Sequence, residues 1–286
     1  MANFDDPDHG GNVEFGVHTH VRVPPLTGIS ADSLSSERPP TSPVPLRSDV
    51  FLAGRQFPVP ETSFSGVLSD LSFMKTKAQN PSTGRYFNNS GEGRHIILKA
   101  DGNMDVRRVT SYNTTSNSIT GESSSVTYPI PNQGVVFVED NVWVEGTVNN
   151  KRVTIVAANL VGGAQANAFI GMNNIRYTNS DGSDIIGIIA QNDVEVIRES
   201  QNFLTIDAAL LAQGGRVGRE NYGTSDHKNT ITINGSIATN LRYGFAYTSG
   251  AGYTNRNLNF DNNLIYFPPP YFPTGTQYAI DQWEEL

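Results

Sequence analysis

The chain has 286 residues, 37% of them hydrophobic and 17% charged, and a formal net charge of −8. This length allows one large domain or two small ones with a buried core, and the 27 glycines bring the apolar share into the range of globular proteins. Wholesale disorder is therefore excluded. Asn, Ser, Thr and Gly replace the usual helix formers, which favours strands and turns.

The charge balance also limits the class of partner. With a pI near 5.1 and only the pair Arg107-Arg108 as a basic cluster, the sequence disfavours a nucleic-acid surface. Cysteine is absent, which excludes disulfides, thiolate metal sites and cysteine nucleophiles. The sequence has no apolar run of about 18 residues, so we expect no membrane span and no secretion signal in this chain.

Residues 1–125 are predicted to form a β-rich region with one helix. Val17–Val23 alternates with a period of two, which indicates a short strand, and the prolines of Pro24–Pro45 indicate a surface loop. Apolar residues recur at helical spacing over residues 65–79, and Asn80-Pro81 follows as a stop signal. This segment is the predicted helix.

A hairpin is predicted after the helix. His95–Ala100 and Met104–Val109 are joined through Asp101-Gly102-Asn103, and an Asp-Gly turn between apolar runs is a hairpin signal. The polar segment Asn113–Ser125 then reads as a connection. We place the domain boundary there, between residues 125 and 126.

From about residue 126 to residue 267 the sequence repeats one short pattern. Each copy places two aliphatic side chains two positions apart, and Asn, Asp or Gly stands at the corners. The copies are Val142–Gly146, Val153–Ala157, Asp193–Ile197, Leu204–Ala208 and Ile231–Gly235. Short strands of this kind fit either an antiparallel sandwich or a solenoid.

The side chains that face inward favour the solenoid. They are β-branched or small, and such side chains stack well in successive coils. Ile185–Ala190 is apolar throughout, as buried parallel strands are. We therefore predict a mainly β protein with a right-handed parallel β-helix over residues 126–267 and an aromatic, proline-rich cap over residues 268–286. The sandwich alternative predicts instead that Val142–Val144 pairs with Val153–Ala157 in a hairpin.

Three blocks of the sequence carry a resemblance. The segment Pro129–Gly146 resembles the signature of a bacterial surface family described as a domain of unknown function related to pilus-assembly proteins. Asp49–Pro60 and the ending Tyr266–Glu285 are similar to further blocks of that family, in the same order. The resemblance implies a β-helical ectodomain of an envelope-anchored, pilin-like protein from a small-genome or uncultivated bacterial lineage. Family members commonly begin with a hydrophobic pilin-type helix, so we expect that the anchor has been removed or is not shared.

Several motifs suggest chemistry but have plainer explanations. His18 and His20 share one strand face, but no third metal ligand is visible. Asn179–Asp184 resembles part of a calcium loop, yet it lacks the acids of an EF-hand, and Gly214–Gly218 lacks the strand–loop–helix frame of a phosphate loop. We interpret both segments as turns.

Three acids are candidates for sugar chemistry. Glu145, Glu195 and Asp207 occupy outward positions of predicted strands, and paired carboxylates on a β-helix are typical of polysaccharide lyases and hydrolases. Isolated acids are also what a solvated sheet face carries. We therefore expect no catalytic residue.

Aromatic residues are densest near the end of the chain. Tyr243, Phe245 and Tyr247 alternate as on one strand face, and Tyr271 and Phe272 follow the triplet Pro268–Pro270. These five residues are predicted as an interaction surface for proteins or glycans. The alternative, which we prefer, is that the aromatics plug the open end of the solenoid, with the prolines carrying Tyr271 and Phe272 back over the last coil.

Together these features predict a non-enzymatic structural or adhesive protein of the bacterial cell surface, associated with a pilus or similar to a minor pilin. The expected partners are envelope or pilus proteins and surface glycans, with no nucleic acid, cofactor or metal. The alternative is a carbohydrate-active enzyme on the same scaffold. It predicts a cleft with at least two acids beside arginine or aromatic residues.

Overall fold

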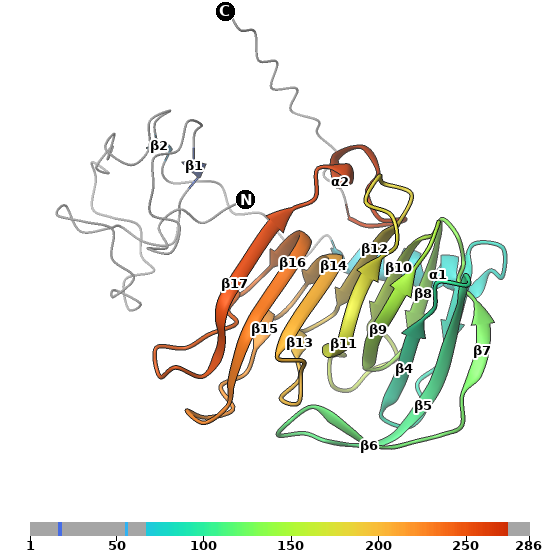
Figure 1. The fold of residues 1–286 in the computed structure, drawn as a ribbon. Helices are drawn as coiled ribbons and strands as arrows, with labels where there is room; N and C mark the ends of the chain where they lie inside the picture. The colour runs from blue at the N-terminus through green and yellow to red at the C-terminus, as the bar shows by residue number, and fades with distance from the viewer. Residues whose placement is uncertain (1–16, 19–54, 57–66, 274–286) are drawn as a thin grey trace, which may run out of the picture. The chain divides into compact units, whose positions relative to one another are not determined.

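The computed structural model describes residues 17–18, 55–56 and 67–273, with side chains from Asp70 to Pro273 (Figure 1). The chain divides into two compact units, Met1–Ser63 and Phe64–Leu286. In the first unit, β1 (Val17–His18) pairs in parallel with β2 (Arg55–Gln56). The remainder of the strand predicted over Val17–Val23 and the predicted loop Pro24–Pro45 lie outside the described residues.

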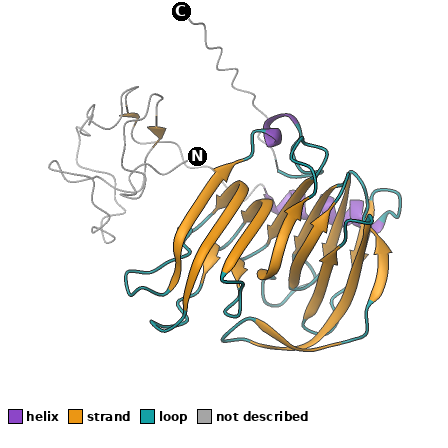
Figure 2. Cartoon of the chain, in the orientation of Figure 1, coloured by secondary structure: helices purple, strands orange, loops and turns teal. Residues whose placement is uncertain are grey.

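The second unit is mainly β, and most of its strands run parallel in one large mixed sheet (Figure 2). Its helices are α1 (Val67–Gln79) and α2 (Asn263–Tyr266). Its strands are β3 (Gly84–Phe87), β4 (Gly93–Leu98), β5 (Asn103–Asn113), β6 (Ser118–Glu122), β7 (Val126–Pro129), β8 (Gly134–Val138), β9 (Val142–Val148), β10 (Arg152–Ala157), β11 (Ala168–Tyr177), β12 (Ile185–Ala190), β13 (Val194–Val196), β14 (Phe203–Ala212), β15 (Val217–Arg219), β16 (His227–Thr239) and β17 (Gly252–Phe260).

The predicted helix is confirmed as α1. Leu71, Met74 and Ala78 are buried at helical spacing and pack against Val135 and Phe137 of β8. An acid in the first turn and a lysine in the last turn complement the helix dipole. The apolar stripe thus fixes α1 against one face of the sheet, behind the strands in Figure 2.

The predicted hairpin is also confirmed. β4 and β5 pair antiparallel, with Leu98 opposite Met104. In the turn, the backbone N–H of Asn103 donates to the Asp101 carboxylate at 2.9 Å, and Gly102 adopts a φ of 85°. The Asp-Gly sequence therefore works as the sequence pattern indicates.

The segment Asn113–Ser125 is more ordered than a connecting loop. It contains β6, which pairs antiparallel with β5 and packs Ile119 near Trp143 of β9. The indole Nε1 of Trp143 donates to the carbonyl of Asn117 at 2.8 Å. These contacts come from distant strands, so the local polar composition could not reveal them.

Apart from the antiparallel pairs that β5 makes, the strands pair in parallel, in two runs joined by the pairing of β11 with β14. One run follows β8, β10, β12, β14, β16 and β17, and the other follows β4, β9, β11, β13 and β15. Figure 1 shows these strands succeeding one another across the array. The hairpin between Val142–Val144 and Val153–Ala157 is absent, because β9 and β10 each pair in parallel with other strands. The antiparallel sandwich is therefore wrong.

Aliphatic side chains lie in register along both runs. In the first run Val136, Ile155, Ile188 and Leu210 are successive partners, and all belong to one buried cluster. In the second run Ile96 is followed by Val144, Ile170 and Val196. The core of the unit lies along these ladders.

The array begins before the predicted boundary at residues 125 and 126. β3 pairs in parallel with β8, and β4 pairs in parallel with β9. Residues 64–125 therefore belong to the same compact unit as the later strands.

The sequence predicts that the proline triplet carries Tyr271 and Phe272 back over the last coil, and this prediction is wrong. The segment after β17 instead lies against β10 and β12. Thr154 of β10 donates a hydrogen bond to the carbonyl of Pro270, and Pro269 and Phe272 lie against Gly187 of β12. A Cβ on Gly187 would lie only 2.7 Å from Pro269 Cβ, so glycine makes room for this approach. Tyr271 also packs on the apolar cluster beneath α1. An apolar outer face in the middle of the array draws the segment there.

Candidate functional site

The three candidate acids do not lie on a solvated face. All three are buried: the solvent-exposed fraction is 6% for Glu145, 3% for Glu195 and 6% for Asp207. Each alternates with residues of the inner core, so the outward direction was predicted correctly. Neighbouring strands and loops cover that side and surround each acid with partners.

Glu145 belongs to a network centred on a buried histidine. His95 places Nε2 3.1 Å from Oε1 of Glu145 and Nδ1 2.9 Å from Oε2 of Glu122. Arg107 forms an ion pair with Glu122, and Asn173 donates to Glu145. Burial lowers the pKa of His95, but the hydrogen bonds to the two carboxylates outweigh it and leave that pKa raised. The network ties β4, β6 and β9 together.

Burial raises the pKa of both carboxyls in this network, yet their hydrogen bonds to His95 leave the pKa of Glu122 and of Glu145 lowered. The three shifts all favour the charged forms, a protonated imidazole between two carboxylates.

Asp207 is held by a polar ladder. Its Oδ2 accepts from Arg176 Nε at 3.0 Å and from the backbone N–H of Tyr177 at 3.1 Å, and its Oδ1 accepts from Asn234 Nδ2 at 2.7 Å. Asn259 donates in turn to Asn234 at 2.9 Å. Both carboxylate oxygens are engaged, which fits a structural role.

Glu195 is less well satisfied. Its Oε2 lies 3.8 Å from Arg216 Nη2, and within residues 70–273 its Oε1 has no hydrogen-bond partner. Burial raises the pKa of Glu195 to about 8, against the opposing effect of Arg216. Arg216 also contacts Glu220 at 2.8 Å and the Tyr247 hydroxyl at 3.3 Å. A carboxyl protonated at neutral pH is chemically able to act as a general acid.

A buried arginine that no sequence motif marks lies next to this group. Arg219 is fully buried, and its Nη2 lies 2.6 Å from Asp226 Oδ1 and 3.1 Å from the carbonyl of Arg198. Its guanidinium lies over the rings of Tyr222 and Tyr253, at 4.8 and 5.9 Å. The sequence contains one indication of this burial: Val217 and Arg219 are two positions apart, which places both side chains on the same face of a strand.

Each of the two motifs interpreted as turns is held by hydrogen bonds to an aspartate. In Gly214–Gly218 the backbone N–H of Arg216 donates to the Asp193 carboxylate at 2.7 Å. In Asn179–Asp184 the Asp184 carboxylate accepts three backbone N–H groups. The side chain of His18 and the whole of His20 lie outside what the structure describes.

The five predicted aromatic residues do not form one surface. Tyr247 lies with Arg216 near β15, and Phe245 is buried at the end of the core, with Tyr243 packed against the same cluster. Instead of a strand, residues 241–248 form turns with two isolated bridges. Tyr271 and Phe272 lie apart, against the cluster of α1 and β8. Phe245 is buried in the core, and the plug at the open end of a solenoid stays a prediction.

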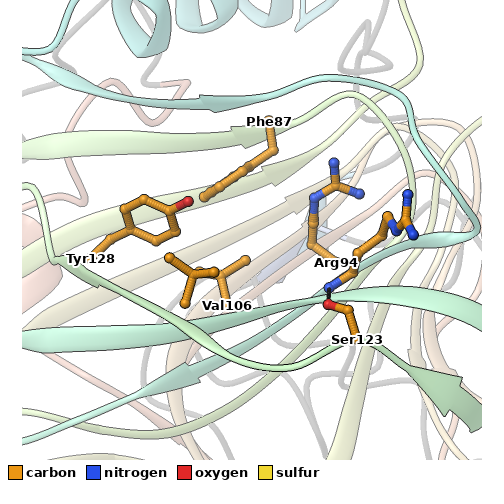
Figure 3. A pocket seen from close by; sticks show the side chains of 7 residues that line it. Phe87, Arg94, Val106, Ser123 and Tyr128 are labelled. Carbon is orange, nitrogen blue, oxygen red and sulfur yellow. Dashed lines mark hydrogen bonds between the residues drawn. The ribbon is translucent and has the colours of Figure 1, made fainter.

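A small pocket that the sequence did not indicate lies between β3, β4, β5 and β7 (Figure 3). Its volume is about 190 Å³. Seven residues line it: Phe87, Arg94, Val106, Arg108, Ser123, Val126 and Tyr128. None of them is acidic, and two are arginines.

Comparisons with family models, curated proteins and solved structures give no match for this chain. In the described part of the chain, no group of three or more His, Asp or Glu residues is placed to hold a metal ion. Among the described helices, none is both long enough and apolar enough to cross a membrane.

Proposed function

We propose that the parallel strands of residues 84–260 are successive coils of a right-handed parallel β-helix. The two ordered runs of parallel strands support this, because each step between strand partners from β8 onward takes roughly 20–33 residues, as in solenoid repeats. The first steps, from β3 to β8 and from β4 to β9, are longer because β5, β6 and β7 are inserted there. The aliphatic ladders in both runs fit the stacking of like residues in adjacent coils. The β-helix thus begins at β3, earlier than the sequence predicts.

We further propose that the protein is a non-enzymatic structural or adhesive component of the bacterial cell surface, associated with a pilus or similar to a minor pilin. The observation that carries the non-enzymatic part is the state of the candidate acids. Glu145 and Asp207 have their oxygens engaged by partners from neighbouring strands. A catalytic carboxylate pair must instead face substrate across a defined gap.

The surface location is supported by the resemblance of Pro129–Gly146 to the pilus-related family and by the acidic, lysine-poor composition. A rigid stack of coils is suited to holding contact surfaces away from a cell envelope. Envelope or pilus proteins and surface glycans remain the proposed partners.

The test combines a glycan array with a polysaccharide-degradation assay on the purified full chain. We expect binding to envelope components or glycans without any product. Labelling of intact producer cells with an antibody to this chain should also be positive. Protein found only inside the cells would contradict the surface role.

A second candidate, a polysaccharide lyase or hydrolase, is favoured by one observation: Glu195 is a buried carboxyl beside Arg216, with a pKa raised to about 8. This enzyme would form product, and Glu195→Gln would abolish it. Asp207→Asn serves as the matched control, because Asp207 is fully hydrogen-bonded within the ladder. Product lost in the Glu195 variant alone would replace the structural proposal.

A further inference from the structure

The pocket between β3, β4, β5 and β7 has an unusual charge arrangement. Arg94 and Arg108 are direct cross-strand partners in the antiparallel pair β4 and β5. Like charges in that position destabilise a sheet. In a chain of net charge −8, a pair of adjacent arginines points to a feature other than stability.

Within the described residues neither arginine forms an ion pair, and Asp140 is the acid whose charge acts on Arg94 from beyond ion-pair distance. Arg94 donates from Nη1 to the carbonyls of Ser90 and Gly93, at 2.7 and 3.0 Å, and from Nη2 to the carbonyl of Asn88 at 3.2 Å. These neutral acceptors fix the guanidinium and leave its charge in place. Arg108 is exposed at the mouth of the pocket.

The remaining wall of the pocket is aromatic and apolar. The rings of Phe87 and Tyr128 meet edge to face with centroids 5.6 Å apart, and Val106 and Val126 complete the wall (Figure 3). Arg85 stacks on Tyr128 with its guanidinium 4.3 Å from the ring centre. This contact holds the Tyr128 ring in place and adds a third positive charge nearby.

The size of the pocket limits the ligand. A volume of about 190 Å³ corresponds to roughly six water molecules, which is room for one sugar-sized ring. A guanidinium binds a carboxylate through two parallel hydrogen bonds, and aromatic rings bind the apolar face of a pyranose.

We propose that this pocket binds an acidic monosaccharide unit, a pyranose ring that carries a carboxylate, with the carboxylate at Arg108 and the ring against Tyr128 and Phe87. Arg94 adds positive charge at the base of the site. This inference deepens the adhesive part of the proposed function and rests on it, since it names one class of surface glycan.

The experiment is a titration of the full-length protein with sodium glucuronate, followed by calorimetry and by ligand-observed saturation-transfer NMR. Glucose tests the ring without the charge, and acetate tests the charge without the ring. We expect a Kd of about 1 mM for glucuronate, which is typical of a small ligand with few contacts, and at least about tenfold weaker binding of the other two. Raising the salt from about 50 mM to about 500 mM should weaken glucuronate binding, because Arg108 is exposed.

Two variants locate the site. Arg108→Ala should weaken glucuronate binding at least about tenfold, and Arg108→Lys should restore part of it, since lysine keeps the charge but loses the bidentate geometry. Arg242→Ala removes an exposed arginine elsewhere in the chain and should leave the Kd unchanged. Circular dichroism of each variant verifies the fold.

Unchanged binding in Arg108→Ala, equal binding of acetate, or no binding at about 10 mM glucuronate overturns the proposal. If glucuronate fails while the chain still binds envelope components and labels on intact cells, only the pocket assignment is lost. Failure of the cell-surface labelling with glucuronate binding intact would instead remove the proposed location.

Discussion

The two ends of the parallel array are closed by different means. At the first end, additional backbone covers the core: β5 pairs antiparallel with β4 and β7, and its Met104 and Val106 enter the buried cluster. At the other end, side chains cover the core. Phe245 and Tyr253 fill the core, and Arg219 stands in register after Val196.

The first end mainly satisfies backbone hydrogen bonds, whereas the second mainly covers the apolar core. The added strand gives β4 a partner on both sides, β9 and β5, and so satisfies its backbone groups. The segment that carries Phe245 shields the core and gives the strands only isolated backbone hydrogen bonds, between Gly244 and β15 and between Phe245 and Tyr253 of β17. Among the described strands, β17 pairs only with β16. Its exposed asparagines and Arg256 discourage pairing with other chains.

Replacement of Phe245 tests most directly whether aromatic side chains close this end of the core. We expect Phe245→Ala to lower the free energy of unfolding by about 3–5 kcal/mol, because it removes a fully packed ring from the core end. Urea unfolding measures this loss. Phe203→Ala, at a position that is 64% exposed, is the control and should stay within about 0.5 kcal/mol of the parent. Equal losses in the two variants would remove Phe245 from the closing device.

The buried charge pair at the same end gives the next effect. Asp226→Asn leaves the fully buried Arg219 without its counter-charge, and we expect a loss of about 3 kcal/mol. Arg219→Met should cost less, because Asp226 keeps its ion pair with Arg198 at 2.9 Å. Thermal and urea unfolding should rank the two variants in this order. The reverse order would mean that packing of the arginine stem outweighs its charge.

Buried titratable groups at both ends make the stability depend on pH. The folded pKa of His95 lies above its ordinary value of 6.5, so its contribution to stability is complete below pH 6.5 and is lost as the pH rises through the raised pKa. Glu122 and Glu145 have lowered pKa values, so their contribution is present above their ordinary value of 4.5 and is lost as the pH falls through the folded pKa. The histidine network of β4, β6 and β9 is therefore strongest between pH 4.5 and 6.5.

At the other end, Glu195 acts in the same direction for a different reason. Its folded pKa is about 8 against an ordinary value of 4.5, so the folded state holds the proton more tightly and stability falls as the pH rises between these values. Each group contributes a slope of at most about 1.4 kcal/mol per pH unit. Urea unfolding from about pH 5 to about pH 9 should show His95→Gln and Glu195→Gln each removing part of the slope. A slope unchanged in both variants would contradict these assignments.

The smallest expected effect is at the free edge. Asn257 of β17 donates to Thr232 of β16 at 3.2 Å and is exposed, so Asn257→Ala should change the free energy of unfolding by less than about 0.5 kcal/mol. Amide hydrogen exchange should nevertheless speed up in β17 and stay unchanged in β4, because the edge strand opens locally. Faster exchange in both strands would indicate global rather than local opening.

Local patterns allowed much of the fold to be predicted. The helix Val67–Gln79 follows from apolar spacing and a proline stop, and the hairpin of β4 and β5 follows from Asp101-Gly102. The in-register aliphatic residues, such as Ile155 and Ile188, follow from the repeated strand pattern. In each case the information lies within a few residues of the element it specifies.

The missed features depend on which distant segment covers a surface. The burial of Glu145 depends on His95 and on the β5–β6 hairpin, and the path of Pro269 to Phe272 depends on the space above Gly187. The pocket depends on the pairing of Arg94 with Arg108. One sequence gives no signal for such contacts, because the partners are far apart along the chain.

The β4–β5 hairpin and the aromatic residues around Phe245 cover the two ends of the array, and the strands between them resemble one another. Such an arrangement can grow in length during evolution. An inserted segment that adds one strand to each run between β12 and β14 would meet the same kinds of side chain on both sides, since the strands contact mainly their neighbours. The β4–β5 pairing at one end and Phe245 at the other would keep their own contacts, whereas the contacts that span the insertion point, of Pro270 with Thr154 and of Ser116 with Arg198, would have to shift. Duplication of a short stretch of the gene could thus lengthen the protein without the invention of a new terminus.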